Sequence, residues 1–349
     1  MELNKRRIRR LAERIFDKQC KIKKELENLS DDMKEKSIED TEYHLYYLFQ
    51  AINLNSKTLF NDYASWLRTL FISIGLPIEY VTINFECIKV ELKFVLSKNV
   101  YKTLCEYLDS GIKVLEDKNY LEKEIEDNNL KELADHYLNA LLAGDKTKAS
   151  NIIMDEVNSG VDIKSIYLDV FQPTLEKIGN LWHHNKISVA KEHYCTAVTQ
   201  FIISRLYGHL FDSKKTSIEK SMVSACIGEE LHEVGIRMVT DFFELEGWDT
   251  YYLGANVPNK DIINSLKEYD SDLLAISTTM TYHISLVKNL IEEIRKDESL
   301  KNIKILVGGR PFKIDKDLWK KVGADGYSLD AKGAVNLAQR LVKGDVSYG

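Results

Sequence analysis

The hydrophobic pattern of the chain changes its period near residue 218, and this change constrains the fold more than any other feature. Beyond that point, short apolar runs alternate with stretches of helical periodicity. A strand followed by a helix, repeated five times, is typical of a doubly wound parallel sheet covered by helices. We therefore expect an α/β domain over residues 213–349. Its expected strands are 222–227, 250–253, 273–277, 303–307 and 326–329, and its expected helices are 234–246, 259–269, 282–297, 313–321 and 331–343.

The residues before this region show helical periodicity alone. Residues 119–212 predict a four-helix bundle with short connections, and residues 1–118 predict a separate all-helical domain with a helix stop at 75–77. Pro173 falls inside one expected helix and predicts a bend there, while Ser188 is the expected N-cap of the last helix. The four helices of the bundle are expected at about 121–143, 146–158, 163–182 and 188–211.

Composition excludes several classes of protein. The 349 residues are 44% hydrophobic and 29% charged, which suits globular domains. No apolar run approaches the roughly 18 residues that span a bilayer, and the charged N-terminus lacks the apolar stretch of a secretory signal. We therefore expect a cytoplasmic protein without membrane contact. The five cysteines are widely spread and form no C-x-x-C pair, which argues against disulfides and against a zinc ribbon.

The first 24 residues hold ten Lys and Arg against three acidic residues, although the net charge of the chain is −6. Ile8, Ile15, Ile22 and Leu29 recur every seven residues, which favours a packing helix or a dimer seam over a nucleic-acid arm. The chain has no helix-turn-helix signature, so we expect no direct DNA binding. This helical domain is instead expected to contact a protein partner or a second copy of the chain.

Ligands of doubly wound sheets bind beyond the carboxyl ends of the strands, so the loops at those ends are the candidate site. An imidazole there is a good ligand for a transition metal, and a nearby carboxylate can accept its other N–H. A glycine pair lets a large group approach the backbone. The residues concerned are Glu230, His232 and Gly235 after the first strand, Ser277 and Thr279 after the third, and Gly308 and Gly309 after the fourth.

The pattern Glu-x-His-x-x-Gly, Ser-x-Thr and Gly-Gly in these loops resembles the cobalamin-binding domain of methionine synthase, corrinoid methyl carriers and cobalamin sensors. The resemblance covers about residues 119–349 and implies a Rossmann-like, flavodoxin-like domain capped by the bundle. It implies that His232 replaces the dimethylbenzimidazole base as the lower cobalt ligand, while the base and its nucleotide tail enter the sheet beside the serine, threonine and glycines. The family pattern begins with Asp, and the longer Glu230 leaves the geometry of the carboxylate–histidine hydrogen bond open.

A second motif lies in the bundle. Trp182 is followed, after nine residues, by Glu192 and His193, which resembles the cap motif of the adenosylcobalamin-dependent photoreceptors of the CarH/LitR type. The resemblance implies that Trp182 packs on the adenosyl group and that Glu192 and His193 hydrogen-bond its polar edge. It also implies that light cleaves the cobalt–carbon bond and that His183 is the candidate upper ligand afterwards. Ordinary bundle core for Trp182 and a solvated helix end for His183 are the simpler interpretations.

These features together predict a cobalamin-dependent light sensor that is not an enzyme. Photolysis of bound adenosylcobalamin would change the conformation of the bundle or the oligomeric state and so signal to a protein partner. One alternative is a corrinoid methyl-carrier protein of a methyltransferase system, with methylcobalamin as its cofactor. Another is a light-independent adenosylcobalamin sensor. A zinc site has suitable residue types but no standard spacing within one element; its members would be His183, His184, Glu192, His193 and His232. The other histidines, His44, His136, His209 and His283, are not expected to be ligands.

Overall fold

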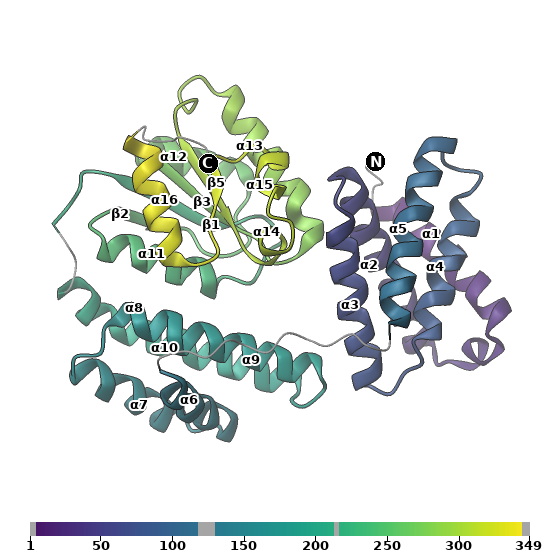
Figure 1. The fold of residues 1–349 in the computed structure, drawn as a ribbon, viewed down its shortest axis with the longest axis horizontal. Helices are drawn as coiled ribbons and strands as arrows, with labels where there is room; N and C mark the ends of the chain where they lie inside the picture. The colour runs from purple at the N-terminus through teal and green to yellow at the C-terminus, as the bar shows by residue number, and fades with distance from the viewer. Residues whose placement is uncertain (1–4, 118–129, 213–215, 344–349) are drawn as a thin grey trace. The chain divides into compact units, whose positions relative to one another are not determined.

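The computed structural model describes residues 5–117, 130–212 and 216–343 (Figure 1). The chain divides into two compact units, Met1–Glu122 and Lys123–Gly349. The predicted bundle and the predicted sheet lie in the second unit together. The predicted domain boundaries at residues 118 and 212 therefore stay predictions.

The described part of the first unit is built of helices. Helix α1 contacts α2 and α4, and its Ile8, Leu11 and Ile15 are buried. The chain leaves α3 through Gly75, whose φ of +73° favours glycine, in agreement with the predicted stop. The helices are α1 (Lys5–Ile22), the 3₁₀ helix η1 (Lys24–Asn28), α2 (Asp31–Asn53), α3 (Lys57–Ser73), α4 (Glu79–Leu92) and α5 (Lys98–Glu116).

Two of the heptad-spaced isoleucines of α1 pack in the hydrophobic core of this unit. Ile8 and Ile15 are at most 2% exposed, whereas Ile22 is 58% exposed. Part of the basic charge on the same helix is neutralised within this unit, because Arg9 forms an ion pair with Glu35 at 2.5 Å. Internal packing, the first of the two interpretations, therefore accounts for the buried part of the heptad pattern.

The second unit contains the predicted bundle. Pro173 lies in the first turn of α9, directly after a π-helical turn. Within a regular α-helix, proline lacks the N–H that would bond to the carbonyl four residues earlier, and its ring clashes with that carbonyl. The preceding π-helical turn is wider than an α-helical turn, so it accommodates the missing hydrogen bond and the ring. The Ser188 N-cap is confirmed, since its Oγ accepts the N–H of Lys191 at 3.3 Å. The first predicted helix lies partly outside the described residues. The helices are α6 (Lys131–Ala143), α7 (Lys146–Asn158), α8 (Ile163–Ser165), the π-helix η2 (Ile166–Phe171), α9 (Gln172–His183) and α10 (Val189–Asp212).

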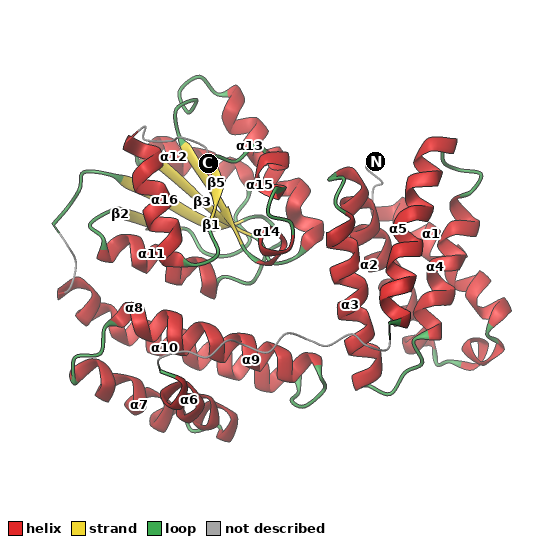
Figure 2. Cartoon of the chain, in the orientation of Figure 1, coloured by secondary structure: helices red, strands yellow, loops and turns green. Residues whose placement is uncertain are grey.

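A five-stranded parallel sheet follows, drawn in yellow in Figure 2. Its strand order is β2-β1-β3-β4-β5, so the topology reverses at β1 and β3. The loops after these two strands lie side by side at the carboxyl edge, because β1 and β3 pair in parallel. The strands are β1 (Ser221–Cys226), β2 (Asp249–Tyr252), β3 (Leu273–Ser277), β4 (Lys304–Gly308) and β5 (Gly326–Tyr327). The predicted fold class is confirmed.

Helices cover both faces of the sheet. Helix α11 contacts α16, and α13 contacts α15, as expected for right-handed crossovers in this strand order. The single helix predicted at 313–321 is wrong. Asp315 is extended there and accepts the N–H of Asp317, which ends one helix before the next begins. The helices are α11 (Val234–Leu245), α12 (Asn259–Glu268), the 3₁₀ helix η3 (Thr281–His283), α13 (Ile284–Lys296), α14 (Arg310–Ile314), α15 (Leu318–Val322) and α16 (Ala331–Lys343).

One hydrophobic core joins the bundle to the sheet. Buried residues from α6, α9 and α10 belong to the same cluster as residues from β1, α11 and α16. The five cysteines are free thiols, as predicted. Within the described residues, no helix is both long and apolar enough to cross a membrane.

Candidate functional site

The loop after β1 folds around its own carboxylate. Glu229 adopts a left-handed φ of +67°, and the next side chain, Glu230, is completely buried. Its Oε1 accepts hydrogen bonds from the backbone N–H groups of Leu231 and His232, each at 3.1 Å. The same oxygen hydrogen-bonds to Nδ1 of the His232 ring. The imidazole is therefore oriented by a residue two positions earlier, as the sequence predicts.

The second oxygen of Glu230 reaches the loop after β3. Oε2 accepts the backbone N–H of Thr279 at 2.7 Å and that of Met280 at 3.0 Å. The hydroxyl of Thr278 and Nδ1 of His283 each lie 3.2 Å from the same oxygen. One carboxylate thus joins two loops of the sheet edge. The extra methylene of Glu, compared with Asp, gives it the reach to do so, which settles the geometry that the sequence left open.

Glu230 is held in its ionised form. Burial by itself would raise its pKa, but hydrogen bonds from His232, His283 and the backbone hold the pKa well below its usual range. Since both carboxylate oxygens accept, each of the two imidazoles donates from Nδ1. The hydrogen bond to Glu230 raises the pKa of His232 against the effect of burial, and the charge of Glu192 adds to the rise. Nε2 of His232 is the ring nitrogen left for a metal.

The surroundings of His232 fit a large, flat and partly apolar ligand. The His232 side chain is 58% exposed, and the neighbouring Leu231 is 71% exposed. An exposed leucine beside an exposed imidazole suits the face of a macrocycle. A Cβ placed on Gly235 or Gly308 would meet no atom within 4 Å, so both positions border open space.

Gly309 brings a third loop into the site. It adopts a φ of +103°, and a Cβ there would lie 1.9 Å from the carbonyl oxygen of Thr278. Only glycine therefore permits this approach of the loops after β3 and β4. The backbone of Thr278 also donates to the carbonyl oxygen of Gly308 at 3.1 Å. Ser277, the last residue of β3, is partly exposed at the same edge.

The cap residues lie at the ends of α9 and α10. Trp182 is 38% exposed, whereas His183 is only 7% exposed. Glu192 hydrogen-bonds to Nδ1 of His193 at 2.5 Å and accepts the hydroxyl proton of Thr196 at 2.9 Å. The charge of Glu192, at the start of α10, contributes to the raised pKa of His232.

A row of polar contacts joins α10 to α11. Successive turns of α11 present Glu233, Arg237 and Asp241 to the bundle. The carboxylate of Asp241 also accepts the hydroxyl of Tyr167, from η2, at 2.8 Å. The contacts with α10 are Gln200 to Glu233 at 2.9 Å, Arg237 to Ser204 at 2.8 Å and Tyr207 to Asp241 at 3.2 Å.

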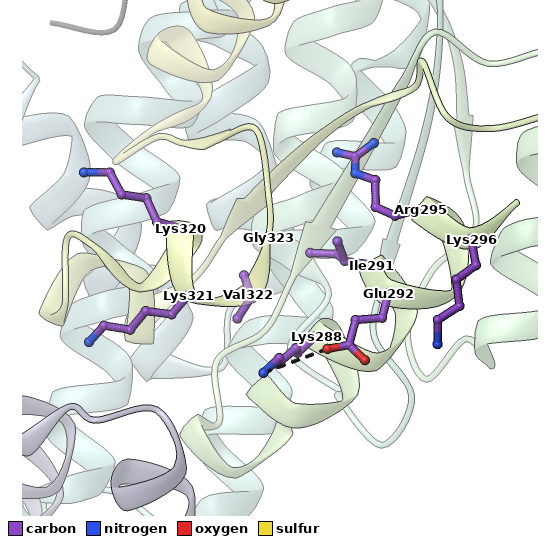
Figure 3. A pocket seen from close by; sticks show the side chains of 9 residues that line it. All are labelled: Lys288, Ile291, Glu292, Arg295, Lys296, Lys320, Lys321, Val322 and Gly323. Atoms are coloured by element: carbon purple, nitrogen blue, oxygen red, sulfur yellow. Dashed lines mark ion pairs between the residues drawn. The ribbon is translucent and has the colours of Figure 1, made fainter. Parts of the chain in front are cut away.

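Two other candidate sites are not supported. Among the residues that the structure describes, no group of three or more His, Cys, Asp and Glu side chains is arranged to hold a metal, so the zinc alternative lacks a site. A cavity of about 390 Å³ opens between α13 and α15 (Figure 3). Its lining is largely basic and contains none of the predicted residues. Nearby acids meet part of this charge: Arg295 binds Asp325 at 2.7 Å and Lys321 binds Asp315 at 2.8 Å.

Two parts of the second unit match known families. Residues 220–336 match the family described as the B12 binding domain, and residues 133–207 match another family of the same description. The chain is therefore a cobalamin-binding protein, as its loop motifs predict.

The relatives are named as corrinoid proteins. Dimethylamine corrinoid protein 3 of Methanosarcina acetivorans is 30% identical over 122 residues, which cover 35% of this chain and 56% of that protein. A corrinoid protein of Desulfitobacterium hafniense is 20% identical over 213 residues, covering 60% and 97% of the two chains. The chain spans little more than half the length of the first relatives. Among solved structures, the chain resembles the Methanosarcina barkeri monomethylamine corrinoid protein, with a TM-score of 0.55 and 18% sequence identity. The comparison covers 61% of this chain and 99% of that one and shows a shared fold.

These comparisons correct the predicted function. Light sensing is wrong, because the relatives are named for methylamines and belong with the first alternative, the corrinoid carriers. The Trp-x9-Glu-His spacing fixes only the residue types and their separation, and it does not by itself specify an adenosyl group. The assignments of adenosylcobalamin and of His183 as a ligand after photolysis depended on that reading. The expectation that the chain is not itself an enzyme agrees with relatives that are named corrinoid proteins.

Sequence reasoning missed two residues of the site. Thr278 lies between the two residues chosen from the Ser-x-Thr motif, and its buried hydroxyl binds Glu230. His283 was expected not to be a metal ligand, and its hydrogen bond to the same carboxylate was not predicted. Both residues follow β3, which pairs with β1, so their side chains can face the loop that carries His232. Their position after this strand is the sequence feature that could have indicated a role.

Proposed function

We propose that the chain is a corrinoid methyl-carrier protein of a methyltransferase system. Bound at the sheet edge, the corrinoid would supply a cobalt atom that accepts and releases a methyl group. The observation that carries the proposal is the exposed imidazole of His232, whose Nδ1 is held by buried Glu230 and whose Nε2 is left for cobalt. The relatives named as dimethylamine corrinoid proteins support a methyl group as the cargo.

Every predicted residue except His183 has a role in this proposal. His232 holds cobalt from below, and Glu230 fixes its ring. Trp182 would shelter the upper face with its partly exposed indole, and Glu192 and His193 would border the same space. The remaining cofactor-binding residues are Gly235, Ser277, Thr279, Gly308 and Gly309 around the nucleotide tail, and Glu192 and His193 on the cap.

The cofactor and partners follow from this role. Methylcobalamin is the loaded form, and the partners are methyltransferases that deliver and remove the methyl group. Methylated amines are the first donors to test, because the relatives are named for them. The helical unit, residues 5–117, lies outside both matched regions, and we propose that it contacts a protein partner.

The first experiment asks which nitrogen binds cobalt. The chain is labelled with ¹⁵N-histidine, loaded with cob(II)alamin, and examined by electron paramagnetic resonance after gel filtration. We expect one corrinoid per chain and a ¹⁵N splitting that disappears in His232→Ala but persists in His136→Ala, an exposed histidine of α6. A chain that takes up no corrinoid, or one whose cobalt keeps the dimethylbenzimidazole nitrogen, contradicts the proposal.

The second experiment tests the cargo. The loaded chain is reduced chemically and treated with radiolabelled iodomethane. We expect about one labelled methyl group per corrinoid to remain with the chain through gel filtration and to pass to a thiol when a methyltransferase is added. Label that never becomes bound to the corrinoid would exclude a carrier.

A further inference from the structure

His283 occupies an unusual place for a residue that is not expected to bind the metal. It ends the short helix η3, and its side chain is 5% exposed. Its ring packs edge-on against Tyr282, with centroids 4.4 Å apart. Its backbone N–H donates to the carbonyl oxygen of Met280 at 3.0 Å, which closes the turn after β3. The imidazole is thus fixed on both sides, with Nδ1 3.2 Å from Oε2 of Glu230.

Glu230 therefore carries one imidazole on each oxygen. His232 is on Oε1 and His283 is on Oε2, and both donate. The hydrogen bond on Oε2 helps to hold the carboxylate in the orientation in which Oε1 accepts from His232. The partner of a metal-bound imidazole controls how strongly that imidazole donates electrons to the metal. A substitution at His283 therefore alters the hydrogen bond of His232 through the shared carboxylate.

The length of Glu230 makes such a support useful. Glutamate has one more rotatable bond than aspartate, and each free bond lets the carboxylate turn away from the ring that it orients. The N–H groups of Thr279 and Met280 hold one edge of Oε2. His283 supplies the side-chain donor that approaches from η3.

We propose that His283 is a positioning residue for the lower cobalt ligand: it fixes the Glu230 carboxylate in the place from which that carboxylate orients and polarises the His232 ring. This inference rests on the proposed role of His232 as that ligand. His283 itself does not touch the metal.

Three variants separate the donor from the bulk of the ring. His283→Leu removes the donor but fills the space, whereas His283→Asn keeps an N–H near the position of Nδ1. His283→Gln keeps a buried amide but carries its N–H one bond further away, and it replaces the Leu variant if that chain does not fold. His44→Leu is the matched control, because His44 is equally buried and its Nδ1 hydrogen-bonds to Tyr63 in the other unit.

The first measurement needs no corrinoid. In the unloaded chain labelled with ¹⁵N-histidine, nuclear magnetic resonance reports which nitrogen of His232 carries the proton. We expect protonation at Nδ1 in the natural chain and in His283→Asn, and a mixture of the two tautomers in His283→Leu. An unchanged tautomer in His283→Leu or His283→Gln overturns the positioning role.

The second measurement is the midpoint potential of the cob(II)alamin/cob(I)alamin couple in the loaded chain. Without His283, the Glu230 carboxylate orients and polarises the His232 ring less, so weaker donation from His232 favours the lower oxidation state, and a tenfold change in relative affinity corresponds to a shift of about 59 mV toward positive values. We expect this shift in His283→Leu, its reversal in His283→Asn and none in His44→Leu. If the corrinoid binds but the potential of His283→Leu is unchanged, this inference fails and the proposed function stands. If the tautomer responds but no variant binds corrinoid, the proposed function fails instead.

Discussion

Oε2 of Glu230 lies 2.7 Å from the backbone nitrogen of Thr279, which is 49 residues further along the chain. The contact joins the loop that carries the candidate cobalt ligand to the loop after the neighbouring strand. Since the same carboxylate also holds the His232 ring, the position of the ligand depends on how two strands of the sheet are paired. A local motif of three residues is thus supported by a long-range contact.

Shortening this side chain should separate the two functions of Glu230. In Glu230→Asp the carboxylate still reaches the imidazole of His232 but not the N–H groups of the second loop. We expect the free energy of unfolding to fall by about 1–3 kcal/mol, because buried donors lose their acceptor, and corrinoid affinity to fall by less than about tenfold, because His232 keeps its carboxylate partner. Urea unfolding and equilibrium dialysis measure the two effects. Glu229→Asp, at an exposed neighbour, should change neither; an unaltered Glu230→Asp variant would contradict the proposed span.

The two adjacent glycines should respond differently to alanine. Gly309→Ala places a Cβ 1.9 Å from the Thr278 carbonyl oxygen at a φ of +103°, so we expect a loss of at least about 2 kcal/mol in unfolding free energy. Gly308→Ala points a methyl group into open space. It should keep its stability and lose corrinoid affinity, because that space is proposed to hold the nucleotide tail. Equal stability losses in the two variants would argue against this assignment.

Asp241 should make the stability of the chain depend on pH. Burial raises its pKa to about 6, although Tyr167 and Tyr207 donate to it. The unfolded value is about 3.9, so the folded chain binds the proton more tightly. The stabilising contribution is complete below about pH 4 and is lost as the pH rises through about 6, a change of about 3 kcal/mol.

Substitution isolates this contribution. Urea unfolding at several pH values should show that Asp241→Asn lacks the decline between pH 4 and 7, whereas Glu298→Gln, at an exposed carboxylate, retains it. The difference between the natural chain and Asp241→Asn is the relevant quantity, since other groups titrate in the same range. A difference that does not vary with pH would show that burial leaves this carboxyl unperturbed.

Trp182 should protect the upper face of the bound corrinoid. Its indole is 38% exposed in the unloaded chain, so Trp182→Leu should cost no more than about 1–2 kcal/mol in stability. The rate at which a small free thiol removes the methyl group from the loaded chain should rise several-fold. Trp319→Leu, at a half-buried tryptophan of α15, serves as the control. Equal rates in all three chains would mean that the cap tryptophan covers something else.

The sequence predicted most of the fold because hydrophobic periodicity directly reports which faces are buried. The five strands and the bundle helices lie within a few residues of their predicted places, and the loop with Glu230 and His232 lies at the predicted edge. The break between α14 and α15 was missed, because it depends on one aspartate that captures a backbone N–H. The roles of Thr278 and His283 were missed because they arise from contacts between strands that are far apart in sequence.

The error in function has a different cause. The spacing of Trp182, Glu192 and His193 fixes where these side chains lie on two helices, not which group they cover. A methyl group and an adenosyl group both occupy the upper face of cobalt. The partners of a carrier or a sensor are bound by surfaces, and no short motif in this chain specifies them.

The polar row between α10 and α11 has a consequence for access to the cofactor. Gln200, Ser204 and Tyr207 each bond to a polar side chain of α11, and each of these bonds can be exchanged for one to solvent. The same two helices also share a buried apolar core, so separating α10 from α11 would expose hydrophobic side chains together with these polar groups, and access by this route would cost free energy.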